Sequence, residues 1–169
     1  AAEDRFIVEG KIYTEVPPGN ADWMGKPLPS VVPEKDLGEP AGTIEGGGEL
    51  EGKTAYVYAP GESQALLAVE RDGEYRLYVF YMFVSYEENG EEDAAEYLKV
   101  YGVESAEDFV SVELIQYPAD GVERSLGVLS ERETEEFYDM FSNLKDGSAA
   151  YFKALSSYDG ETNSVEDTE

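Results

Sequence analysis

The sequence has 169 residues, of which 41% are hydrophobic and 12% aromatic, so a single domain of this size can bury a core without disulfide bonds. Its 38 Asp and Glu residues outnumber 12 Lys and Arg residues, and the formal charge of -26 argues against nucleic acid and anionic lipid surfaces as partners. The absence of His and Cys excludes imidazole-based and thiol-based catalysis and the common zinc sites.

The amino-terminal third predicts strands and a long loop. Residues 5–14 read as a strand or two short ones, with Gly10 interrupting the pattern as at a bulge or a close backbone approach. Residues 16–48 contain six prolines and many glycines, which forbid a long helix. We expect a long structured loop there, with one strand near residues 42–45.

The strongest pattern lies in residues 54–84, where three runs rich in Val, Tyr, Leu and Phe predict an antiparallel meander. Asp72 and Gly73 separate the last two runs and indicate a tight hairpin turn. The last run is apolar on both faces and predicts a central strand, with Leu77, Val79 and Phe80 in the core. Simple alternation places Phe83 on the face of Leu77.

The remaining sequence predicts helices on either side of a strand pair. A helix is predicted over residues 91–101, before Gly102, with a stripe of Ala94, Tyr97, Leu98 and Tyr101 on one face. Strands follow at 109–117 and 124–129. Ser130 and Glu133 form a capping box that opens a helix, and Ser148 is placed to cap another. The predicted buried stripes of these two helices are Phe137, Met140, Phe141 and Leu144, and then Tyr151, Phe152, Leu155 and Tyr158.

These elements predict an α+β fold, with a mainly antiparallel sheet and about three helices packed on one side. We assign residues 1–160 to a single domain and residues 161–169 to a disordered tail or linker. No stretch reaches the length of a membrane span, so the chain is not expected to be integral to a membrane. The opening Ala-Ala-Glu-Asp, in place of Met, predicts a removed targeting segment and a location outside the cytoplasm.

Carboxylates supply the chemistry that the composition leaves open. Glu113 shares a predicted strand face with apolar residues and is the first candidate for a buried acid, although a solvated or Arg-paired Glu113 is the simpler alternative. Asp159, Glu161 and Asn163 have the spacing of a calcium loop, but Ser164 stands where the turn glycine belongs. We therefore predict no catalytic centre, no metal site and no cofactor.

Trp23, Met24 and Lys26 form the candidate binding site for a partner or ligand, because tryptophan is enriched at binding interfaces and these residues lie in the proline-rich loop. The structural alternative is that Trp23 folds back and fixes its own loop to the core.

Four segments carry a resemblance to a known group of proteins. They are "IVEGKIY" at residues 7–13, "GEPAGTI" at 38–44, "DGEYRLYVF" at 72–80 and "YGVESAEDFVSVEL" at 101–114, with the helix "SERETEEFYDMFSNL" at 130–144. The chain resembles the small extracytoplasmic domains of Gram-positive lipoproteins and the outer domains of membrane metallopeptidase antirepressors. The resemblance implies a surface-anchored sensory or accessory protein, held by a lipid on a removed N-terminal segment.

The composition and the resemblance favour a non-enzymatic extracytoplasmic domain that binds an unidentified protein or small ligand. The first alternative is an interaction or inhibitory module that uses the Trp23 loop. The second is a small carboxylate-dependent hydrolase acting on glycans, which would require two acids held at a fixed distance with one pKa raised by burial.

Overall fold

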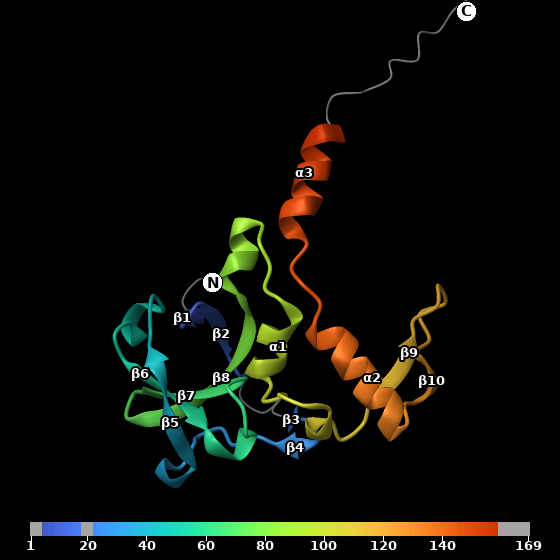
Figure 1. The fold of residues 1–169 in the computed structure, drawn as a ribbon. Coiled ribbons are helices and arrows are strands. Elements are labelled where there is room, and N and C mark those ends of the chain that lie inside the picture. The colour runs from blue at the N-terminus through green and yellow to red at the C-terminus, as the bar shows by residue number, and fades with distance from the viewer. Residues whose placement is uncertain (1–4, 18–21, 159–169) are drawn as a thin grey trace, which may run out of the picture.

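A computed structural model describes residues 5–17 and 22–158 of the chain. The described chain has an α+β fold, with a curled antiparallel sheet and three α-helices, which confirms the predicted class (Figure 1). The six-stranded sheet has the order β1 (Arg5–Val8), β2 (Lys11–Glu15), β8 (Glu74–Phe83), β7 (Leu66–Arg71), β6 (Thr54–Tyr58) and β5 (Leu37–Thr43).

Two small hairpins and a set of helices complete the described chain. The hairpins pair β3 (Asp22–Trp23) with β4 (Lys26–Pro27), and β9 (Glu113–Gln116) with β10 (Arg124–Val128). The α-helices are α1 (Ala94–Val100), α2 (Glu131–Ser142) and α3 (Ser148–Tyr158). The short 3-10 helices are η1 (Glu34–Asp36), η2 (Gly48–Leu50), η3 (Ala59–Gly61), η4 (Val84–Glu88) and η5 (Ala106–Asp108).

Strands β1 and β2 form a hairpin, so the second of the two alternatives predicted for residues 5–14, one strand or two short ones, is right. The prediction of a bulge at Gly10 is wrong, because Glu9 and Gly10 form the turn itself, with φ angles of 49° and 71°. Two successive positive φ angles match the right-handed twist of the flanking strands, and glycine adopts such an angle at no steric cost.

The meander of β6, β7 and β8 is confirmed, and β8 is central, between β2 and β7. Asp72 and Gly73 form the predicted tight turn, with φ angles of 53° and 82°. Leu77 and Phe80 are buried, and Val79 is partly buried against the core cluster that contains Leu77. The core therefore lies on both faces of the central strands.

A bulge in β8 changes the face of Phe83. Residues Ile12 and Tyr13 of β2 pair with Met82 and Phe80, so Tyr81 is the extra residue. An inserted residue shifts the alternation of side chains by one position. Phe83 therefore joins Phe80 in one core cluster while Tyr81 is exposed, and the expectation that Phe83 shares the face of Leu77 is wrong.

The loop at residues 16–48 contains more regular structure than its prolines suggested. Its main strand, β5, covers Leu37–Thr43 rather than residues 42–45. Pro40 lies inside β5, and the pairing with β6 shifts register on either side of it. Because β5 is the last strand of the sheet, a residue that lacks an N–H group is tolerated there.

Helix α1 connects the sheet to the rest of the chain. It begins at Ala94, later than expected, and Val100 is its buried residue, which the predicted stripe had omitted. Tyr97 packs against the same core cluster. Gly102, with φ 73°, ends the helix as predicted, and the Val103 N–H donates to the Leu98 carbonyl oxygen at 2.9 Å.

The capping box of α2 is confirmed. The Glu133 N–H donates to Ser130 Oγ at 3.4 Å, and Glu133 Oε2 accepts from the Ser130 N–H at 2.8 Å. The predicted buried stripe is wrong, because Met140 and Leu144 are 62% and 50% exposed and no residue of α2 is buried. The period of the sequence identified the apolar face correctly, but described segments cover it only in part: Phe137 and Phe141 are half-buried, and Phe109 packs on Phe137.

Strand β9 and helix α3 are similarly exposed. The predicted strand at residues 109–117 is limited to Glu113–Gln116, and all four of its residues are exposed. The α3 residues Tyr151, Phe152 and Leu155 are exposed as well, so the expected buried face of that helix is wrong for these residues. Figure 1 shows β9 and β10 standing apart from the six-stranded sheet and α3 extending away from it. The expected tail at residues 161–169 lies outside the described residues.

Candidate functional site

Trp23 is held against the body of the protein. It lies in β3, is partly buried and packs against both core clusters. Its indole ring stacks on Tyr101, just after α1, with centroids 6.2 Å apart and planes 13° apart. These contacts fix the β3–β4 hairpin to the region where α1 meets the sheet, which is the structural alternative considered for this residue.

Met24 and Lys26 lie at the open end of the same hairpin. Met24 has a φ angle of 50° and is 74% exposed, and Lys26 is exposed too. Asp22 Oδ1 accepts a hydrogen bond from the Gly25 N–H at 2.7 Å, which closes the turn between them. The hairpin thus offers one apolar side chain and one cation to solvent, while the indole faces inward.

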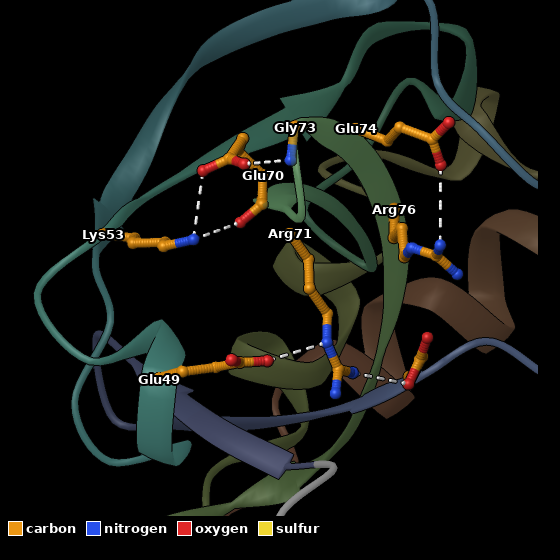
Figure 2. A network of polar contacts seen from close by, with 8 residues as sticks. Glu49, Lys53, Glu70, Arg71, Gly73, Glu74 and Arg76 are labelled. Atoms are coloured by element: carbon orange, nitrogen blue, oxygen red, sulfur yellow. Dashed lines mark hydrogen bonds and ion pairs between the residues drawn. The ribbon is translucent and has the colours of Figure 1, made fainter.

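A network of ion pairs joins separate parts of the sheet (Figure 2). Arg71 of β7 bonds Glu49 through Nε at 3.0 Å and Glu15 through Nη1 at 3.2 Å. Nearby, Lys53 bonds Glu70 at 3.0 Å. Because Arg71 already contacts two carboxylates, its guanidinium is engaged in holding η2 and β2 to β7 rather than presented to an anionic ligand.

Carboxyl groups with shifted pKa values stabilise turns and helix ends. Hydrogen bonds lower the pKa of each, and the largest contribution comes from a backbone N–H group or, for Glu133 and Asp146, from a serine hydroxyl. The groups are Glu70, Asp93, Asp108, Glu133 and Asp146. Such bonds favour the ionised form, so these acids are poorly suited to donate a proton in catalysis.

The other candidate acids do not form a site in the described chain. Glu113 is exposed on β9 and makes no ion pair with another described residue. Within residues 5–17 and 22–158, no group of three or more Asp or Glu side chains is placed to hold a metal ion. The calcium-loop candidates Asp159, Glu161 and Asn163 lie outside these ranges.

Burial divides the described chain at Val100. Every buried side chain of residues 5–17 and 22–157 lies at or before Val100, whereas large apolar side chains are exposed along the segment from Val110 to Leu155. We refer to this set as the C-terminal apolar surface: Val110, Leu114, Ile115, Tyr117, Val122, Leu126, Val128, Met140, Leu144, Tyr151, Phe152 and Leu155. Single exposed apolar residues are common, whereas contiguous apolar patches are typical of interaction sites. Four members of the set, Leu114, Ile115, Leu126 and Val128, lie together on the paired strands β9 and β10.

A groove of about 430 Å³ lies within this surface, between η5, the end of β10 and the start of α2. Its apolar lining includes Phe109, Val110, Val128 and Leu129. Phe109 is positioned by aromatic contacts with α2, at 6.1 Å from Phe137 and 6.2 Å from Tyr138 between ring centroids. We call it the acid-rimmed groove, because its remaining lining includes Glu107, Glu131 and Glu135.

Sequence reasoning missed this groove for an identifiable reason. The alternation at residues 109–117 and the stripe of α2 both indicated apolar faces, and the stripe of α2 was predicted to be buried. The signal that could have separated them is the density of charge: residues 131–136 contain four Glu residues and one Arg. A helix whose first six residues are mostly charged typically lies at the protein surface.

Comparison of the chain with models of protein families, with curated proteins and with solved structures finds no match to any of them. No helix in the described part of the chain is both long enough and apolar enough to cross a membrane.

Proposed function

We propose that this chain is a non-enzymatic, extracytoplasmic protein-binding domain that binds its partner through the C-terminal apolar surface. The observation that carries the proposal is the contrast at Val100: the sheet before it has a buried core, and the described segment after it has exposed apolar side chains instead. Burying apolar surface is the main source of binding free energy between proteins. Burial of these exposed side chains by a partner would therefore supply binding free energy.

The local architecture supports the same proposal. Strands β9 and β10 pair only with each other within the described chain, and a two-stranded hairpin is marginally stable without a further strand or helix against its face. Its Leu126 and Val128 are 66% and 63% exposed. A partner that covers this hairpin would complete its packing.

The Trp23 hairpin is a weaker basis for binding in this proposal. Its largest apolar group, the indole, already packs against the core clusters, so Met24 is the apolar side chain left for a partner. We keep the hairpin as a secondary contact that presents Met24 and Lys26.

The proposed location rests on the resemblance to extracytoplasmic lipoprotein domains and on the acidic composition. Labelling of intact producing cells with a membrane-impermeant amine reagent should modify Lys26 and Lys99, which are both exposed. Labelling that occurs only after the cells are lysed would contradict an extracytoplasmic location.

Site-specific photocrosslinking in the producing cells tests the binding surface. A photoreactive amino acid is placed at Val110 or at Leu126, which are 102% and 66% exposed, and at Tyr81 as the control. Tyr81 is 59% exposed on β8 and lies outside the proposed surface, so its accessibility is matched to that of Leu126. We expect a discrete crosslinked protein from Val110 and Leu126 and none from Tyr81. Crosslinking that is equal at all three sites, or absent from all, would contradict the proposal.

A further inference from the structure

The acid-rimmed groove combines apolar and acidic lining residues. Val110 is fully exposed and Val128 is 63% exposed, so both offer apolar area to an incoming side chain. The groove volume of about 430 Å³ falls within the usual range of ligand pockets, roughly 300–1,000 Å³, and can hold several aliphatic side chains. These apolar lining residues favour an occupant with apolar side chains.

The acidic lining residues select the charge of that occupant. Glu107, Glu131 and Glu135 line the groove, and its lining residues include no Lys or Arg. Within the described part of the chain, none of these three carboxylates makes an ion pair or accepts a side-chain hydrogen bond. By contrast, Glu136 of α2 pairs with Arg132 at 3.0 Å. Cations from a partner would therefore meet carboxylates that are not already engaged in an ion pair with another described residue.

We propose that the acid-rimmed groove binds a basic amphipathic segment of a partner protein, in which Leu-like side chains enter the groove and Lys or Arg side chains reach its three glutamates. This inference rests on the proposed function and deepens it by naming the chemical class of the partner. Charge complementarity decides the choice: a chain with a formal charge of -26 attracts a basic segment and repels another acidic one.

Two other occupants are disfavoured by the same charge. A second copy of the chain would bring another charge of -26 to the interface. The chain's own residues 161–169 contain four acidic residues and no Lys or Arg, so they would face the glutamates with like charge.

The two parts of the groove have different roles in recognition. Apolar burial supplies about 25 cal/mol per Å² removed from water and so provides most of the affinity. Exposed ion pairs contribute little each, but they exclude partners of the wrong charge and accelerate encounter. Binding should consequently weaken with salt without disappearing.

The test measures binding of short synthetic peptides to the full chain by isothermal titration calorimetry. The probe alternates Lys and Leu, and two comparison peptides of equal length alternate Glu with Leu and Lys with Ser. We expect binding of the Lys-Leu peptide only. The triple variant Glu107→Gln/Glu131→Gln/Glu135→Gln should bind it about tenfold more weakly at low ionic strength, as expected for the loss of three exposed ion pairs.

Matched variants separate the groove from the general charge of the protein. The control triple variant Glu39→Gln/Glu51→Gln/Glu88→Gln removes the same charge from exposed acids of the sheet region, and Val31→Ser is the control for Val110→Ser. We expect full binding by both controls and weaker binding by Val110→Ser. An equal loss in the two triple variants would show that the peptide responds to net charge alone and would overturn the proposal.

The remaining outcomes also decide the question. Binding of the Glu-Leu peptide, or a dimer in sedimentation that Val110→Ser dissociates, would overturn the basic-segment proposal and assign the groove to an acidic or self-associating occupant. Failure of the peptide test while Val110 still crosslinks to a discrete protein would refute this inference and leave the proposed function standing. Failure of both experiments would refute both.

Discussion

Trp23 makes contacts that reach farther across the molecule than those of its neighbours. It belongs to a hairpin of two two-residue strands, yet it packs against both core clusters and stacks on Tyr101. Tyr101 in turn lies 6.2 Å from Phe80 in an edge-on arrangement, between ring centroids. An aromatic chain therefore runs from the proline-rich loop to the central strand and gives that loop a defined position.

We predict that Trp23→Ala lowers the free energy of unfolding by about 2 kcal/mol, because a partly buried aromatic ring and its stacking partner lose their contact. Urea denaturation of the full chain measures this change. Met24→Ala is the matched control, and its effect should stay within about 0.5 kcal/mol, since Met24 is exposed. Equal stability of the wild type and Trp23→Ala would show that the indole is free to serve a partner instead.

Three hydrogen bonds join the amino terminus of α1 to the end of α2, and we call this contact between residues 93–94 and 144–146 the seam. Asp93 accepts hydrogen bonds from the Asp146 N–H at 2.9 Å and from Lys145 Nζ at 3.0 Å. The Ala94 N–H donates to the Leu144 carbonyl oxygen at 3.1 Å. The first two bonds hold the pKa of Asp93 below its ordinary value, the backbone N–H of Asp146 being the larger cause. The ionised Asp93 thus holds the segment that connects α2 to α3 against the start of α1.

The seam should open at low pH. A carboxyl whose pKa is lower in the folded state contributes stability above its unfolded pKa of about 4, and that contribution is lost as pH falls through the folded value. We predict that protection of the Asp146 amide from hydrogen exchange decreases below about pH 4. Asp93→Asn should lower this protection already at neutral pH and reduce its dependence on pH.

Asp139→Asn is the matched control for the seam. Asp139 is exposed on α2 and makes no side-chain hydrogen bond or ion pair within the described residues. Its variant should keep the protection of the Asp146 amide and the pH profile of the wild type. An identical profile in Asp93→Asn and in the wild type would show that the ionisation of Asp93 does not hold the seam.

The whole molecule combines a well-packed sheet with a weakly buried segment. In the part of the chain that the structure describes, the large side chains with less than 2% exposure lie in residues 6–100, and β7 contributes a continuous buried run from Leu66 to Val69. After α1 the described chain is joined to this core mainly through the contacts of α2 with α1, whereas the contacts of α2 with η5 lie within the later segment itself. Local stability follows buried apolar contacts, so the two parts should differ in their rates of opening.

We predict that the amides of β7 and β8 exchange slowest with solvent deuterium and that those of β9 and β10 exchange with far less protection. Hydrogen-exchange mass spectrometry of the full chain measures both in one experiment, with a fully unfolded sample as the reference. Equal protection in β7 and β9 would show that the part after Val100 folds and unfolds together with the core. It would also contradict the proposal that a partner is needed to complete the packing of the β9–β10 hairpin.

The sequence by itself determined the features whose causes are local. The turn at Asp72 and Gly73, the end of α1 at Gly102 and the capping box of Ser130 with Glu133 were predicted and are confirmed. Each depends on hydrogen bonds or backbone angles within about four residues, so a short window contains the whole cause. The α+β class followed from the alternation of strand-like and helix-like periods.

Only the tertiary structure decided which apolar faces are covered. A periodic stripe states that one face of an element is apolar, but burial depends on a second element that is distant in sequence. Val100 was omitted and is buried, whereas Met140 and Leu144 were predicted to be buried and are exposed. The bulge at Tyr81 and the acid-rimmed groove were missed for the same reason: strand register and the meeting of η5, β10 and α2 are set by nonlocal contacts.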